Sequence, residues 1–241
     1  NEKTFNQVAT TYSGEDQMSI DGTMKKFGIM LVMLLGAASF TWGLYYKNYD
    51  VMPIAMGSMF AGFIVALIII FKKKWAPYLS LAYALLQGLF LGAISAVFED
   101  AFAVSYPGIV MQAVMLTFGV ALSMFALYYF RIIKATGTFK KVVIGATMGI
   151  ALFYLVAMVM NMFGTEMPYL HSNGTIGIGI SVFVVVVAAL NLILDFDMIE
   201  QGANAGAPKY FEWYGAFGLM VTIVWLYLEI LRLLSKLASR K

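Results

Sequence analysis

Long apolar stretches separated by short polar segments make up most of this chain. Seven of them cover residues 27–46, 51–71, 76–98, 109–130, 142–163, 176–194 and 213–234. Each is near the ~20 residues that an α-helix needs to cross ~30 Å of hydrocarbon. Strands of a transmembrane barrel would instead alternate over about 10 residues. The pattern therefore predicts an all-α integral membrane protein, a bundle of seven transmembrane helices.

Residues 1–26 are polar and weakly patterned. We expect a cytoplasmic or interfacial N-terminal arm (1–26) and a seven-helix transmembrane domain (27–241), with no soluble module. The first apolar stretch follows Lys25 and Lys26, as the apolar core of a signal peptide would. It is longer than the roughly 7–15 residues of such a core, so we expect a transmembrane helix that is not cleaved.

The last apolar stretch has a polar stripe at helical spacing. Steps of four and three residues place its members on one helix face. They are Gly218, Thr222, Trp225, Glu229, Arg232 and Lys236. Because a polar face avoids lipid, we expect it to point into the bundle, which makes the last helix the central one.

Pairs of small residues four positions apart recur in the other stretches. This spacing lets helix backbones approach closely in a membrane, and we expect it to serve packing within the bundle. The pairs are Gly57/Ala61, Gly88/Gly92, Gly119/Ser123, Gly145/Gly149 and Gly177/Ser181.

Composition agrees with the hydropathy pattern. Charged residues are 12% of the chain and mean hydropathy is +0.83, whereas soluble domains carry roughly 25% charged residues. The absence of cysteine excludes disulfides, thiol catalysis and cysteine metal sites. No H-E-x-x-H, G-x-S-x-G, P-loop or dinucleotide-binding motif is present, so we expect neither an enzyme nor a bound cofactor.

The net charge of +3 lies at the ends of the apolar stretches, which favours a topological role over nucleic-acid binding. Basic residues gather before the first stretch and in alternate loops, at 72–74 and 131–141. Positive loops remain on the cytoplasmic side, so the amino terminus is predicted to be cytoplasmic. Seven crossings would leave the basic tail outside, against that rule. Either the last segment is re-entrant or the upstream loops dominate.

Two carboxylates are the main candidates for function. Glu229 is the acid inside an apolar stretch, and Asp195 closes the stretch before it. In one interpretation the two approach each other and share a proton, whose loss separates the helices; the deprotonated pair then offers oxygen ligands for Ca²⁺. In the other, Glu229 pairs with Arg232 one turn on or with a loop lysine, and Asp195 lies in water at a helix end.

Other polar residues near these acids are secondary candidates. Asn191 precedes Asp195 by four residues and shares its helix face. Asp197 falls on a different face and is expected to meet water. Arg232 is the basic neighbour of Glu229.

The two acidic segments, LILDFDMIEQG (192–202) and WLYLEILRLL (225–234), resemble the Bax inhibitor (transmembrane Bax inhibitor motif) family, in particular its bacterial Bax-inhibitor-like branch. The resemblance covers nearly all of residues 20–241. It implies a multi-pass protein with a central last helix and a pH-sensitive Ca²⁺ leak. Some bacterial members modulate a membrane-bound AAA protease.

The resemblance also implies residue roles. Asp195 and Glu229 correspond to the acids of the family's pH sensor. The basic latch near the end of the second helix falls within Lys72, Lys73 and Lys74. The sequence departs from the family pattern in three ways. Phe196 and Asp197 stand where the family has Thr and Gln, Glu replaces the second Asp, and lysine replaces arginine, which loses bidentate pairing.

These observations predict a pH-sensitive calcium leak channel of the bacterial cytoplasmic membrane, gated by Asp195 and Glu229. Its partners would be the lipid bilayer, Ca²⁺ and protons, and the two acids would ligate Ca²⁺ transiently. The alternative is an interaction protein without transport that restrains a membrane-bound AAA protease through residues 1–26 and its lipid-facing helices. A proton-coupled transporter is a third option, but no pair of broken helices marks a substrate site.

Overall fold

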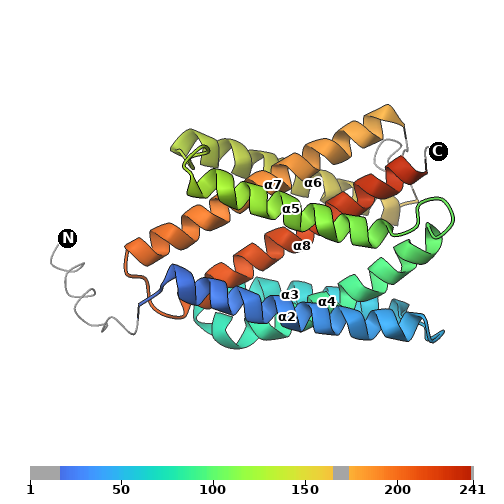
Figure 1. Ribbon diagram of the computed structural model, residues 1–241, viewed down its shortest axis with the longest axis horizontal. Coiled ribbons are helices and arrows are strands. Elements are labelled where there is room, and N and C mark those ends of the chain that lie inside the picture. The colour runs from blue at the N-terminus through green and yellow to red at the C-terminus, as the bar shows by residue number, and fades with distance from the viewer. Residues whose placement is uncertain (1–16, 165–173, 240–241) are drawn as a thin grey trace. The chain divides into compact units, whose positions relative to one another are not determined.

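The computed structural model describes residues 17–164 and 174–239, and this part of the chain forms seven long helices (Figure 1). They are α2 (Ile20–Tyr45), α3 (Met52–Phe71), α4 (Ala76–Ala101), α5 (Ile109–Tyr129), α6 (Gly137–Met162), α7 (Thr175–Asn204) and α8 (Phe211–Ala238). A 3₁₀ turn, η2 (Lys73–Trp75), leads into α4. All seven are long and apolar enough to cross a membrane, so the predicted fold class is confirmed.

Two helices extend well beyond their predicted bounds. α2 begins seven residues early because Ser19, in extended conformation, caps it: its hydroxyl accepts a hydrogen bond from the amide of Gly22. α7 continues past Asp195 to Asn204 as a single helix (Figure 1). In both cases the extra turns are polar, and hydropathy marks only the part of a helix that lies in hydrocarbon. The expected arm at 1–26 falls mostly on residues 1–16, outside the described residues.

The chain divides into two compact units. One consists of Asn1–Val97 and Asp195–Val221, and the other of Phe98–Leu194 and Thr222–Lys241. α7 and α8 each contribute one part to each unit. Each unit is described below by itself.

Close packing of α2 and α4 characterises the first unit. A Cβ atom built on Gly92 would overlap the carbonyl of Ala38 and the hydroxyl of Thr41, and one on Gly88 would overlap the carbonyl of Leu34. The Gly88/Gly92 pair is therefore a close helix contact, as predicted. The prediction is wrong for Gly57, Gly119, Gly145 and Gly149, where an added Cβ would meet nothing within 4 Å. Small residues permit close approach, but only an opposing backbone produces it.

The second unit packs α6, α7 and α8 around buried aliphatic side chains. Ile150, Val184 and Val187 form this cluster, and Tyr154 and Trp225 pack against it. The entry to α5 is held by Glu99, whose carboxylate accepts hydrogen bonds from the amides of Gly108 (2.8 Å) and Val110 (3.0 Å). A carboxylate is favourable there because it faces the positive end of the helix.

α8 is the most buried of the seven helices. In its most apolar stretch 67% of the residues are buried, against 44% for the α4 and α7 spans and at most 22% for the other four. The predicted stripe accounts for part of this burial, because Thr222, Glu229 and Lys236 are all buried. The last helix is therefore the most buried one, and its central position in the bundle stays a prediction.

Candidate functional site

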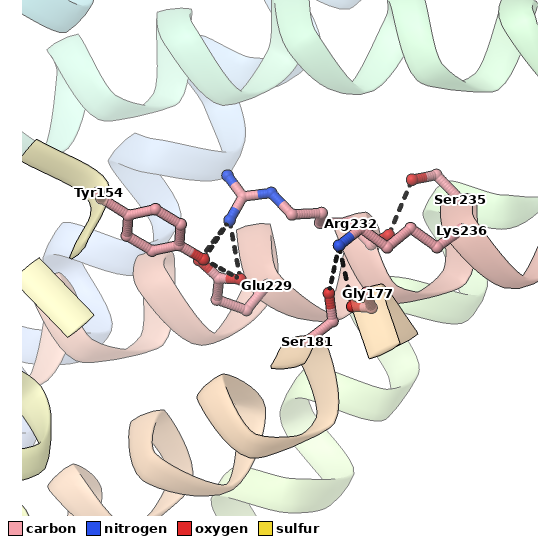
Figure 2. Close-up of polar contacts among 7 residues, drawn as sticks. All are labelled: Tyr154, Gly177, Ser181, Glu229, Arg232, Ser235 and Lys236. Atoms are coloured by element: carbon pink, nitrogen blue, oxygen red, sulfur yellow. Dashed lines mark hydrogen bonds and ion pairs between the residues drawn. The ribbon is translucent and has the colours of Figure 1, made fainter. Parts of the chain in front are cut away.

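Glu229 lies about five turns from the start of α8, and its residue is 2% exposed. Nη1 of Arg232 donates hydrogen bonds to both carboxylate oxygens, at 2.7 and 2.9 Å. The hydroxyl of Tyr154, from α6, lies 3.1 Å from each of the same oxygens (Figure 2). The sequence predicted the Arg232 contact as one of two alternatives, and this contact is present.

Tyr154 completes a closed triangle of polar groups. Its hydroxyl accepts a hydrogen bond from Nη1 of Arg232 (2.7 Å) while it donates to Glu229, and the guanidinium lies over its ring, 5.1 Å from the centroid. A buried carboxylate is strongly unfavourable unless its charge and lone pairs are satisfied. Here the cation one turn away offsets the charge, and a phenol from a second helix adds a further hydrogen bond.

Lys236 forms a second buried polar contact in the same unit. It is 6% exposed, and its ammonium donates to the carbonyl oxygen of Gly177 (3.0 Å) and the hydroxyl of Ser181 (2.9 Å), both on α7 (Figure 2). The sequence placed Lys236 on the polar stripe but did not predict its partners. The stripe spacing was the available signal, because Lys236 follows Arg232 by four residues.

Asn191 links α7 to α6 within this unit. Its amide donates to the hydroxyl of Thr147 and to the carbonyl of Val187, both at 2.8 Å. It therefore serves as an interhelical hydrogen-bonding residue.

Asp195 belongs to the first unit. It is partly buried, and its carboxylate lies against α8 at Gly218, where an added Cβ would be 3.7 Å from Oδ1. Asp197 accepts a hydrogen bond from the side chain of Gln201 (2.7 Å) at the exposed surface of α7. Asp195 and Glu229 are thus described in separate units, each in its own surroundings, and their pairing stays a prediction.

The candidate latch residues lie at the junction of α3 and α4. The ammonium of Lys73 lies over the rings of Phe211 (5.9 Å) and Tyr214 (5.2 Å), at the start of α8. Lys72 lies over Trp75 (4.6 Å), and Lys74 is exposed. Lys73 is thus the candidate that contacts the helix on which Glu229 lies, although at the opposite end.

Metal ligation by the two acids is not tested by this geometry. Across residues 17–164 and 174–239 no three histidine, cysteine or acidic side chains gather as a metal site. The transient Ca²⁺ role of Asp195 and Glu229 therefore remains a prediction from the sequence.

The largest omission of the sequence analysis is Glu212, at the start of α8. Its side chain is fully buried in the first unit. The carboxylate accepts hydrogen bonds from the amide and hydroxyl of Ser19 (both 2.9 Å) and forms ion pairs with Lys26 and Lys209. No sequence pattern signalled this cluster, because Lys26 and Glu212 are 186 residues apart.

Backbone contacts support the same junction. The amide of Met18 donates to the carbonyl of Ala207 (2.7 Å), and Gln17 forms an isolated bridge with Pro208. The start of α2 is thereby fastened to the loop between α7 and α8.

One comparison with known proteins gives a match. The family model described as Bax inhibitor 1 like matches residues 1–239. Comparisons with curated proteins and with solved structures give none.

Proposed function

Because this chain belongs to the Bax inhibitor 1 like family of membrane proteins, we propose that it provides a pH-sensitive leak pathway for Ca²⁺ across the bacterial cytoplasmic membrane. Asp195 and Glu229 are its titrating carboxylates. The observation that supports this most directly is the buried Glu229 carboxylate, held by Arg232 and Tyr154 in the most buried transmembrane helix. Acids at membrane depth are costly and usually mark ion or proton pathways.

In this proposal the Glu229–Arg232 pair is the closed form of the pathway. While the guanidinium is bound, the carboxylate's charge is offset and a passing cation gains little from it. Arg232 is 42% exposed as a side chain, so it has room to turn away, whereas Glu229 is 3% exposed and stays inside. Release of Arg232 would leave an oxygen ligand suited to Ca²⁺.

Asp195 is proposed as the second proton-sensitive group, and Lys73 as its electrostatic partner among the three candidate lysines. Lys73 reaches the first two turns of α8 through Phe211 and Tyr214, and Asp195 lies one turn further along α8, at Gly218. The amino terminus is cytoplasmic in this proposal, because the basic loops then remain on the cytoplasmic side. No catalytic or cofactor-dependent step is proposed.

The test is Ca²⁺ flux in proteoliposomes, measured between roughly pH 5 and pH 8. We expect Asp195→Asn and Glu229→Gln each to lower the flux about tenfold, or roughly 1.4 kcal/mol in the barrier, and to flatten its pH response. Asp21→Asn is the matched control, because Asp21 forms an exposed pair with Lys25 on α2 and should leave flux unchanged.

If neither substitution changes the flux or its pH response, the assignment of these two acids as the pH-sensitive groups is refuted. Folded protein without any flux would refute the leak itself and favour the non-transporting interaction protein that modulates a membrane-bound AAA protease.

A further inference from the structure

Lys236 is buried close to the end of α8. α8 ends two residues later, at Ala238, and the neighbouring Leu237 and Ser239 are exposed. A lysine in such a position normally extends its ammonium to the interface. Lys236 instead turns inward and remains 6% exposed.

The groups that receive the ammonium are neutral oxygens. The Gly177 carbonyl and the Ser181 hydroxyl are four residues apart on α7, so they lie on one face of that helix, and Ser181 is 2% exposed. Within the described part of the chain the ammonium makes no ion pair. Backbone carbonyl oxygens replace the hydration shell of K⁺ in selective pores, and a serine hydroxyl offers a comparable oxygen acceptor.

We propose that Gly177 and Ser181 form a binding site for a small cation, of the primary ammonium class, and that Lys236 occupies it as a tethered ligand. The site has two oxygen acceptors, and the lysine that fills it is buried. It is distinct from the Glu229 triangle, which uses Tyr154 and Arg232.

The ammonium in the occupied site affects the charge balance of this part of α8. Along this part of α8 the charged groups are the buried carboxylate of Glu229, the partly exposed guanidinium of Arg232 and the buried ammonium of Lys236. With Glu229 paired to Arg232, the ammonium of Lys236 is the excess positive charge, and it repels a mobile cation in a medium of low dielectric constant. This step rests on the proposed leak. If that leak exists, the charge of Lys236 reduces the cation flux through it.

The site itself is tested by chemical rescue. In Lys236→Ala the acceptors remain and the ammonium is gone, so n-propylammonium should bind there and raise the Tm of the detergent-solubilised variant by about 2–4 °C, saturably. Tetramethylammonium at equal ionic strength is the control, because it has no N–H to donate. Neither the wild type nor Lys236→Ala/Ser181→Ala should respond. Equal responses to both ions, or no response in folded Lys236→Ala, would overturn the site.

A second measurement needs no destabilised variant. In the wild type, acylation of Lys236 should be at least tenfold slower than that of Lys25, whose side chain is 74% exposed, as followed by peptide mass spectrometry. Ser181→Ala should accelerate the labelling of Lys236 and leave Lys25 unchanged. Equal rates for the two lysines in the wild type would refute the occupied site.

Flux measurements separate this inference from the proposed function. Lys236→Met retains the apolar stem without the charge, and we expect it to raise cation flux about tenfold. Rescue by n-propylammonium without flux in any variant would support the site and refute the leak. Flux in the wild type without rescue of Lys236→Ala would support the leak and refute the site.

Discussion

At the scale of single residues, Tyr154 determines how the Glu229 carboxylate is held. Its hydroxyl donates to the carboxylate and accepts from Arg232, so one phenol connects both members of the ion pair. It also comes from α6, whereas Glu229 and Arg232 share α8. The pair alone would only stabilise its own helix; with Tyr154 it joins two helices.

Replacing Tyr154 with phenylalanine should therefore destabilise the protein while leaving its packing intact. The lost hydrogen bonds to a charged partner are worth about 1.5–3 kcal/mol, and the half-exposed Arg232 places the expected value near the lower end. For a chain of this size the Tm should fall by about 3–6 °C. Tyr78→Phe is the control, because Tyr78 is 81% exposed. Equal Tm values for the two variants would show that the triangle contributes nothing to stability.

At the scale of helices, the contact between α2 and α4 depends on two glycines. Gly88 and Gly92 allow the α2 backbone to approach so closely that no side chain fits between the helices. Gly57 in α3 has the same type of spacing in the sequence but open space around it. Identical motifs therefore have different energetic importance, which depends on the partner helix.

This difference can be measured with matched substitutions. Gly92→Ala should destabilise the protein by about 1–3 kcal/mol, because the new methyl group forces α2 and α4 apart. Gly57→Ala should be neutral or stabilising by up to roughly 1 kcal/mol, since alanine is the better helix former. Thermal unfolding in one detergent compares the two. A Gly92→Ala variant as stable as Gly57→Ala would contradict the close approach.

At the scale of the whole chain, the Glu212 cluster joins segments that are far apart in the sequence. Ser19 and Lys26 at the start of α2 meet Glu212 at the start of α8, 193 and 186 residues later. Gly22 faces the carboxylate so closely that a Cβ would overlap it. The first unit is therefore held together by a buried ion pair as well as by apolar packing.

Glu212→Gln should be among the most destabilising single substitutions in the first unit. It leaves the ammonium of Lys26, 17% exposed as a side chain, without its carboxylate, and breaking a buried pair typically costs about 3–5 kcal/mol. Asp21→Asn breaks an exposed pair on the same helix and should leave the stability nearly unchanged. Limited proteolysis within 17–26 should accelerate in Glu212→Gln only. Similar stability of the two variants would contradict a structural role for the buried acid.

Features that depend on local chain properties were predictable from the sequence. The seven spans follow from apolar length, which the bilayer thickness alone requires. The burial of α8 follows from its polar stripe, and the Glu229–Arg232 contact follows from a spacing of three residues within one helix. The predicted start of α2 and the predicted end of α7 were nevertheless wrong, because the polar terminal turns of these helices carry no hydropathy signal.

The remaining polar contacts were decided by the tertiary structure. Tyr154 meets Glu229 across 75 positions, Ser181 meets Lys236 across 55, and Lys26 meets Glu212 across 186. No periodicity relates such residues, since each contact depends on which helices pack together and in what rotation. The sequence by itself thus determined which residues are costly in a membrane, and only the packing of the helices decided which partners offset that cost.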